Sequence, residues 1–234
     1  MSLFIVTGCT VADAEALARN NMSAFWTDSN WRALWNRGQT LDFIIEQSVK
    51  RMPRNLLRDR ESLRHLKALD PNTGRLVGYA RWILPDDHLN TEPTGEPVWV
   101  DGRVPNVSPE ERLAFERLAG TANWHHNHAM DHLDVPVTAM KAALISKKQY
   151  IVLDYLAVHP ENKRKGIATA LVEAGIAKAR QLGLDILVTA FKQGFYVYRK
   201  LGFETLDQII QDDSMYGGDG EYAVYFMEYA VSKA

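Results

Sequence analysis

A basic, glycine-containing turn in the final third of the chain carries the clearest potential for binding chemistry. Residues 163–168 read KRKGIA and lie between an apolar segment and an amphipathic one. If a strand leads into this turn and a helix starts from it, the first helical N–H groups are unpaired and attract anions. Gly166 permits a close backbone approach, Ala168 is small, and the three cations add charge. The turn predicts a phosphate-binding site, with an exposed basic helix cap as the alternative.

The turn lacks the spacing of two common nucleotide-binding motifs. It is neither G-x-G-x-x-G nor G-x-x-x-x-G-K-[ST], so dinucleotide and P-loop interpretations lose their main support. The segments on both sides still suit phosphate binding. Tyr150–Val158 is almost wholly apolar and predicts a central strand buried on both faces, which Pro160 ends. A helix is expected over Gly166–Leu182, because apolar residues recur there at spacings of three and four before the C-capping Gly183.

The strand, turn and helix together resemble a family signature. The segment LDYLAVHPENKRKGIATALV resembles that of the GNAT acetyltransferases, in which an apolar strand precedes V-x-P, [Q/R]-x-x-G-x-[G/A] and a helix. Gly166 and Ala168 match the small positions, whereas Lys163 stands where the family usually has Gln or Arg. The resemblance implies that backbone N–H groups of the turn bind the pyrophosphate of acetyl-CoA. It assigns this role to the N–H groups from about Arg164 to Thr169. The cosubstrate-binding residues expected in this turn are Lys163, Arg164, Lys165, Gly166, Ile167, Ala168 and Thr169.

A second motif downstream extends the resemblance. Residues 194–203 read GFYVYRKLGF, which resembles the family's closing motif, a tyrosine four residues before Gly-Phe. The segment LVGYARW at 76–82 looks like part of the family's central hairpin. The resemblance further implies that the backbone of Leu156, Ala157 and Val158 pairs with the pantetheine arm of acetyl-CoA as an added strand, where the sheet splays.

Tyr198 is the residue expected to contact the cosubstrate and to act in the chemistry. Transfer of acetyl from a thioester to an amine releases a thiolate, and a phenol that is protonated at neutral pH can donate to it. A backbone N–H would stabilise the oxyanion formed on attack. The alternative is a helix tyrosine packed on the sheet. Tyr196, two residues away, lies on another helix face.

Asp154 interrupts the apolar strand and is the candidate base or substrate anchor. A buried carboxylate is costly without partners, so a structural acid bonded to backbone or to an arginine is the alternative. Strand alternation predicts that Asp154 shares a face with Val152 and Leu156. Other possible bases, which the sequence does not rank, are Glu46, His88 and Asp131.

The remaining pattern predicts an α/β fold with a mixed, mostly antiparallel sheet flanked by helices. Residues 1–234 are expected to form a single GNAT domain, with residues 86–148 as a helical and loop insertion between the third and fourth strands. Expected strands are Leu3–Thr7, Arg64–Asp70, Arg75–Leu84, Tyr150–Val158, Ile186–Ala190, Phe203–Ile210 and Tyr222–Val231. Further expected helices are Val11–Trp26 after Thr10, Thr40–Arg51, Ser108–Ala119, most of Asn123–Ile145, and Phe195–Leu201.

Two aromatic clusters attract attention without fixing a function. His128 and His132 are four residues apart and would share a metal on a helix, but Ala129 stands where H-E-x-x-H has glutamate. An exposed polar helix start is the preferred interpretation, and no metal is expected. Trp26, Trp31 and Trp35 could line an acceptor pocket or serve ordinary packing.

The charge and cysteine content indicate which binding partners and which cellular compartment to expect. The formal net charge is −2, so no general attraction to nucleic acid or to a membrane is expected. The single cysteine, Cys9, permits no intrachain disulfide, and the start lacks the pattern of a secretory signal, so a cytoplasmic location is expected.

The resemblance to the GNAT acetyltransferases implies an acetyl-CoA-dependent N-acetyltransferase. It would move acetyl directly to a primary amine, favouring a small molecule. A protein lysine or N-terminal acetyltransferase and a non-catalytic acyl-CoA-binding module are the alternatives. The identity of the acceptor and the oligomeric state stay open.

Overall fold

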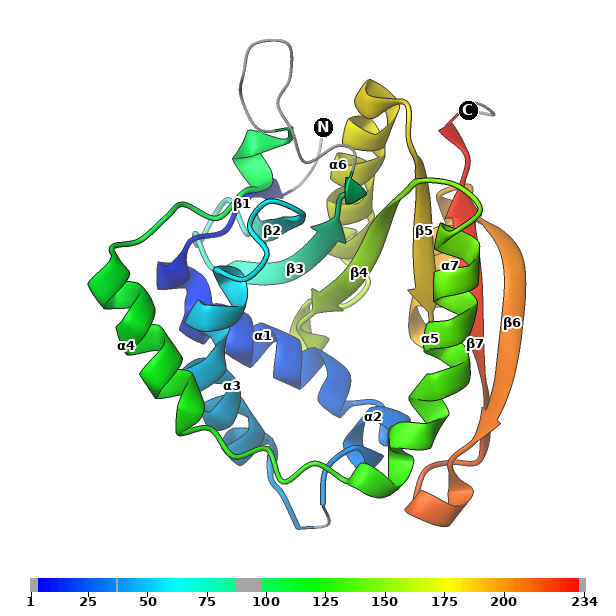
Figure 1. The fold of residues 1–234 in the computed structure, drawn as a ribbon, viewed down its shortest axis with the longest axis horizontal. Helices are drawn as coiled ribbons and strands as arrows, with labels where there is room; N and C mark the ends of the chain where they lie inside the picture. The colour runs from blue at the N-terminus through cyan, green and yellow to red at the C-terminus, as the bar shows by residue number, and fades with distance from the viewer. Residues whose placement is uncertain (1–3, 37, 87–97, 232–234) are drawn as a thin grey trace.

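The computed structural model describes residues 4–36, 38–86 and 98–231, which fold around one seven-stranded sheet (Figure 1). The strands are β1 (Ile5–Gly8), β2 (Leu63–Leu69), β3 (Leu76–Ile83), β4 (Tyr150–Val158), β5 (Asp185–Ala190), β6 (Glu204–Asp212) and β7 (Glu221–Tyr229). The helices are α1 (Ala14–Trp26), α2 (Ser29–Ala33), α3 (Leu41–Leu56), α4 (Pro109–Gly120), α5 (Asp131–Ile145), α6 (Ile167–Leu182) and α7 (Lys192–Lys200). Short 3-10 turns include η3 (Val100–Gly102), η4 (His128–Met130) and η5 (Pro160–Asn162). No described helix has the length and apolar character needed to cross a membrane.

The predicted fold class and most predicted elements are confirmed. The sheet order is β1-β2-β3-β4-β5-β7-β6, and every neighbouring pair is antiparallel except β4 with β5. Some boundaries differ from the prediction; for example, α7 begins at Lys192 and not at Phe195. Helix α3 continues through Pro53 to Leu56, because the buried Met52 and Leu56 hold its last turn against the core. Most of Asn123–Ile145 is helical, as predicted, since η4 leads into α5 at Asp131, while residues 123–127 form no helix.

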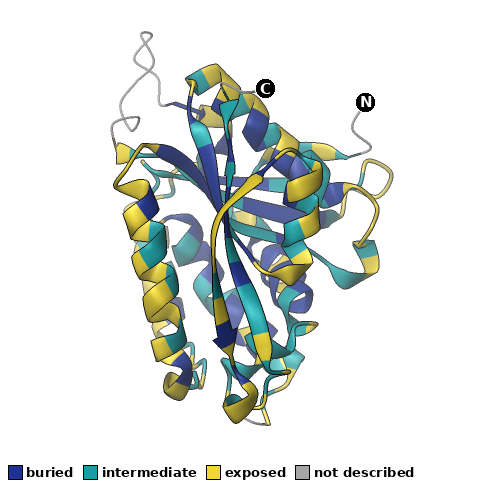
Figure 2. Cartoon of the chain, turned by 90° about the vertical axis from the view of Figure 1, so that its right-hand side faces the viewer, coloured by how far each residue is buried: buried dark blue, intermediate teal, exposed yellow. Residues whose placement is uncertain are grey.

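Helices cover both faces of the sheet. Helix α6 packs on one face, where the apolar residues of β3 and β4 meet Leu171 and Val172. The approach is close, since a Cβ on Gly175 would lie 2.1 Å from the Trp82 ring. Helices α1 and α3 cover the other face over β3, and α5 covers it over β5 and β7. The outer strand β6 stays largely exposed (Figure 2).

The sheet opens between β4 and β5. These parallel strands pair only from Tyr150 with Asp185 to Leu153 with Val188. Beyond Leu153, β4 continues to Val158 with β3 as its only partner strand among the described residues, while β5 continues to Ala190 beside β7. The β5-facing edge of the second half of β4 therefore lacks a ladder, as the predicted splay requires.

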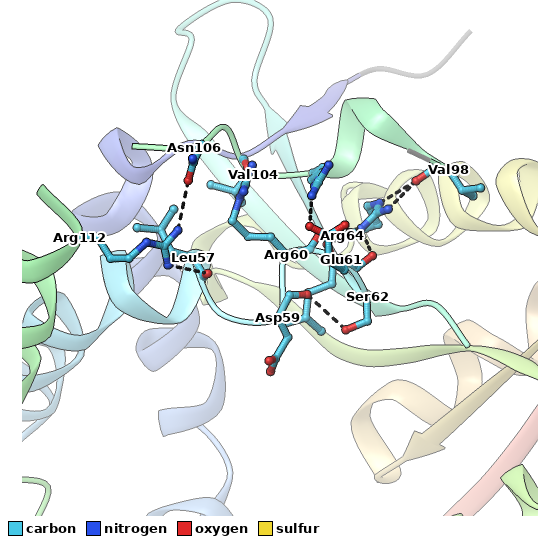
Figure 3. Close-up of polar contacts among 12 residues, drawn as sticks. Leu57, Asp59, Arg60, Glu61, Ser62, Arg64, Val98, Val104, Asn106 and Arg112 are labelled. Atoms are coloured by element: carbon cyan, nitrogen blue, oxygen red, sulfur yellow. Dashed lines mark hydrogen bonds and ion pairs between the residues drawn. The ribbon is translucent and has the colours of Figure 1, made fainter. Parts of the chain in front are cut away.

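The segment between β3 and β4 supplies the predicted insertion and is anchored by arginines (Figure 3). The Arg64 side chain is fully buried, and its Nε donates to the carbonyl of Val98 over 3.0 Å. Its Nη1 donates to the carbonyls of Arg60 and Glu61. Burial lowers the pKa of Arg64 to about 10, so the guanidinium remains charged at neutral pH. Carbonyl dipoles thus satisfy a buried cation and hold the returning chain against β2.

Candidate active site

The turn between β4 and α6 has the geometry of an anion site. Gly166 is the N-cap of α6 with φ 87°, and Arg164 before it has φ 63°. Glycine is favoured at 166 because it adopts this positive φ without steric cost, although a Cβ there would meet no described atom within 4 Å. The first intrahelical bond runs from Ala170 N to Gly166 O, so the preceding N–H groups remain available.

The cationic side chains of the turn point in different directions. The Lys163 ammonium donates to Thr27 Oγ1 over 3.1 Å, and the Lys165 ammonium donates to Asn162 over 2.8 Å. Arg164 has no hydrogen-bond or ion-pair partner in the described part of the chain. Lys163 and Arg164 border the adjoining cleft, whereas Lys165 does not.

A cleft of about 610 Å³ joins the turn to the opening of the sheet. It is bordered by nearly every predicted cosubstrate residue: Leu156, Ala157, Val158, Lys163, Arg164, Gly166, Ile167, Ala168, Thr169 and Tyr198. Side chains from α1, α2 and α5 complete the wall, including Phe25, Trp31, Met130 and Leu133. The structure thus brings two separated sequence motifs to one cavity.

Tyr198 reaches the cleft from α7 while remaining 5% exposed. Its ring packs on Phe203 at 5.4 Å, and Gly194, one turn earlier, leaves it room. The hydroxyl has no hydrogen-bond partner among the described residues, and burial raises the pKa of this phenol. Tyr198 therefore stays protonated at neutral pH, with a donor free for a ligand. Tyr196 is 74% exposed and does not border the cleft.

Asp154 lies in a β-bulge, which corrects the predicted face. Arg81 pairs with Tyr155 and Trp82 with Leu153, so Asp154 has no partner across the ladder. Asp154 contacts Lys141 on α5, the helix that covers Val152. Leu156 instead packs into the α6 core with Leu153. The prediction that Asp154 shares a face with Leu156 was wrong, because the extra residue reverses the alternation.

Two cationic side chains, those of Arg81 and Lys141, form ion pairs with the ionised Asp154 carboxylate. Arg81 Nε donates to Oδ2 over 2.9 Å, and Lys141 Nζ donates to Oδ1 over 3.2 Å. Burial alone would raise the pKa of Asp154, but Arg81 and Lys141 outweigh it and hold the pKa below its usual value. The group borders the cleft as an ionised carboxylate that accepts protons weakly. This geometry favours the structural alternative over a base.

The other possible bases lie elsewhere. Glu46 is paired with Lys50 on the exposed side of α3, and Asp131 bonds to two histidines at the start of α5. Neither borders the cleft. His88 falls outside the described residues.

The cleft lining carries two groups of charged residues of opposite sign. In the described part of the chain its only cationic lining side chains are Lys163 and Arg164, both at the turn. Its acidic lining residues are Asp28, Asp134 and Asp154, of which Asp154 is ionised and paired with Arg81 and Lys141. Asp134 is exposed and has no hydrogen-bond or ion-pair partner in the described structure. The cleft therefore combines a cationic turn suited to an anion with carboxylates suited to a cation.

Tyr222 shows that the acids gather at one place. Burial raises the pKa of Tyr222 to about 12, with further contributions from the carboxylates of Asp213, Asp134 and Asp28. The motif search missed these acids and Tyr222, since they come from four separate segments outside both motifs. The sequence showed only that each of these segments carries a polar residue. That pattern does not indicate that the four side chains lie close together in the fold.

The tryptophans divide between lining and packing. Trp31 borders the cleft, whereas Trp26 and Trp35 border a second hollow beside α2. Trp31 and Trp35 contact edge-on at 5.1 Å, and Trp35 stacks on Trp124 at 5.0 Å. Only Trp31 of the three thus borders the cleft, while Trp26 and Trp35 pack against neighbouring aromatic rings.

Comparison with known proteins links this geometry to one family. Residues 125–205 match the model of the "Acetyltransferase (GNAT) domain" family. No curated protein sequence matches the chain.

Solved acetyltransferases share the fold at low identity. A protein from Corynebacterium glutamicum described as "histone acetyltransferase HPA2 and related acetyltransferase" is 19% identical, with a TM-score of 0.58 over 97% of this chain and 96% of that one. The polyamine N-acetyltransferase of Drosophila melanogaster, which forms N-acetylagmatine, is 15% identical, with a TM-score of 0.56 over 97% and 99%. The PaiA N-acetyltransferase of Thermoplasma acidophilum, in complex with coenzyme A, is 15% identical, with a TM-score of 0.52 over 98% and 99%.

Proposed function

We propose that this chain is an N-acetyltransferase of the GNAT superfamily that transfers acetyl from acetyl-CoA directly to the primary amine of a small, cationic molecule. The match of residues 125–205 to the GNAT acetyltransferase domain family and the shared fold support this proposal. One observation carries the proposal. A cleft joins an anion-binding turn, an unpaired strand edge and a buried phenol with a free hydroxyl. Under this proposal residues 1–234 act as one domain, with residues 86–148 as an insertion that contributes to the acceptor wall.

The anionic cosubstrate fits the turn and the open strand edge. We assign its pyrophosphate to the N–H groups from Arg164 to Thr169, with Lys163 and Arg164 adding charge from their side chains. Lys165, bonded to Asn162, contributes only at longer range. The pantetheine amides are assigned to the backbone of Leu156–Val158, whose β5-facing edge lacks a ladder.

The chemistry requires one bond to form and one to break. The amine nitrogen attacks the thioester carbonyl, the new C–N bond forms, and collapse of the oxyanion breaks the C–S bond. The departing thiolate takes the Tyr198 proton, which solvent then replaces. Because Asp154 is held ionised by two cations, we assign it to positioning β4, and the amine releases its proton to water.

The acceptor is inferred from the far end of the cleft. Phe25 and Trp31 offer an apolar and aromatic wall, and Asp28 and Asp134 place negative charge beside it. Most aliphatic amines are protonated at neutral pH, so the carboxylates of Asp28 and Asp134 attract them. The bound amine then loses its proton before it attacks. A neutral or anionic acceptor gains nothing from this arrangement.

The decisive test combines binding and turnover. Calorimetry should show one equivalent of acetyl-CoA bound, and a thiol-release assay should show turnover with agmatine, putrescine or phenethylamine. A lysine peptide and an N-terminal peptide represent the protein alternatives, and glucosamine tests a sugar amine. Absence of acetyl-CoA binding would overturn the proposal entirely. Binding without turnover on any amine would favour the non-catalytic module, and turnover confined to peptides would reject the small-molecule assignment.

A further inference from the structure

Four histidines crowd the approach to α5, outside the cleft. They are His125, His126, His128 and His132. The pair of His128 and His132, which the four-residue spacing suggested and the missing glutamate disfavoured, does not form, because His128 precedes the α-helix and His132 Nδ1 contacts the carbonyl of Ala129. A different set converges instead. His126 Nε2 lies 2.7 Å from Asp131 Oδ1, and His128 Nδ1 lies 3.0 Å from Asp131 Oδ2.

The backbone holds His126 in place. Residue 126 forms an isolated antiparallel bridge with Trp35, in which Asn127 N donates to Leu34 O over 2.8 Å. Asn36 N donates to the carbonyl of His125, which adopts a left-handed φ of 47°. The Trp35 ring lies edge-on to the His126 ring at 6.0 Å. The position of this imidazole is therefore set by tertiary structure.

We propose that His126, His128 and Asp131 bind one divalent transition-metal ion of the zinc class. Each residue offers one ligand atom, and these atoms lie within 4.8 Å of one another. Two imidazoles and a carboxylate are ligands that Zn²⁺ accepts, with solvent completing the coordination. The side chains of His128 and Asp131 are 82% and 56% exposed, so an ion and its water can enter.

The ion would fasten two segments that border the acceptor end. The β-bridge connects the histidine segment to the end of α2, and α5 begins at the ligand Asp131. Met130 and Leu133, on either side of Asp131, border the cleft, as does Leu34. Metal binding would therefore stabilise the acceptor wall without contacting the reacting atoms.

Calorimetric titration of the untagged, chelator-stripped chain with ZnCl₂ tests the site. We expect one equivalent of zinc to bind, and His126→Ala and Asp131→Asn each to weaken binding by at least about tenfold. Co²⁺ should give visible ligand-field absorption that His126→Ala abolishes. His132→Ala is the matched control, because it removes a neighbouring imidazole outside the cluster, and its affinity should stay within about twofold of the parent.

Three results would overturn the assignment. These are no stoichiometric zinc binding by the parent chain, unchanged affinity in both ligand variants, and equal loss in His132→Ala. Circular dichroism and acetyl-CoA calorimetry on each variant identify any that fails to fold. Since the two ligands are titrated separately, loss of the zinc site leaves the acetyltransferase assignment intact, and failure of acetyl-CoA binding leaves the zinc result readable.

Discussion

At the η5–α6 turn the cleft is bounded by backbone amides and cations of one continuous segment, whereas its far end is walled by side chains from α2, α5 and β7. The first end depends on a left-handed glycine, a helix start and an unpaired strand edge. The second depends on which side chains meet after folding. Substitutions at the two ends should therefore affect different kinetic constants, and Tyr198, between them, should affect turnover.

Tyr198→Phe is expected to have the largest effect. It removes the hydroxyl, which carries the only acidic proton of the side chain, while keeping the ring that packs on Phe203. Loss of a positioned general acid should lower kcat by about 100-fold with little change in the affinity for acetyl-CoA. Steady-state kinetics and calorimetry measure the two quantities. Unchanged kcat would remove Tyr198 from the chemistry, and Tyr196→Phe, on the exposed face of α7, serves as the control.

Asp154→Asn should chiefly affect stability. The substitution leaves Arg81 and Lys141 without their carboxylate, at a cost of about 2 kcal/mol, or roughly 6 °C in Tm. Because the folded-state pKa of Asp154 is lowered, its contribution is fully present above the ordinary aspartate pKa and is lost as pH falls through the folded value.

Denaturant unfolding of the parent and Asp154→Asn across the acid range measures that contribution. The gap in unfolding free energy should be constant near neutral pH and close below about pH 4. A gap that widened on acidification would contradict the ion-pair account. The pH dependence of kcat/KM gives a second test. If the parent shows an ionisation near neutral pH that is missing in Asp154→Asn, Asp154 acts as the base.

Gly166→Ala addresses the backbone-built end alone. A Cβ in the left-handed region costs about 1–2 kcal/mol, although the site itself has room. Relaxation of the turn should weaken acetyl-CoA binding about fivefold and leave the acceptor KM unchanged. Gly183→Ala, with φ 65° at the other end of α6, imposes comparable strain away from the cleft. Equal loss of affinity in both variants would attribute the effect to the stability of α6.

The same contrast explains how much the sequence could predict. The β4–turn–α6 unit was predicted because adjacent residues build it, and a phosphate site at a helix start follows from local geometry. The bulge at Asp154 was missed, since it arises from the register of Arg81 and Trp82 on another strand. The convergence of Asp28, Asp134 and Tyr222 was equally inaccessible, because no local pattern records contacts between distant segments.

Asp134→Asn tests the side-chain-built end and should give the smallest effect. The carboxylate is exposed and partly screened, so its removal should raise KM for phenethylamine about threefold, with kcat and acetyl-CoA affinity unchanged. Inhibition by 2-phenylethanol, which lacks the ammonium, should not change. Glu173→Gln removes the same charge from an exposed position outside the cleft and controls for net charge. If it raises KM equally, or if 2-phenylethanol weakens in parallel, Asp134 does not recognise the acceptor cation, because a local charge must discriminate between the amine and its neutral analogue.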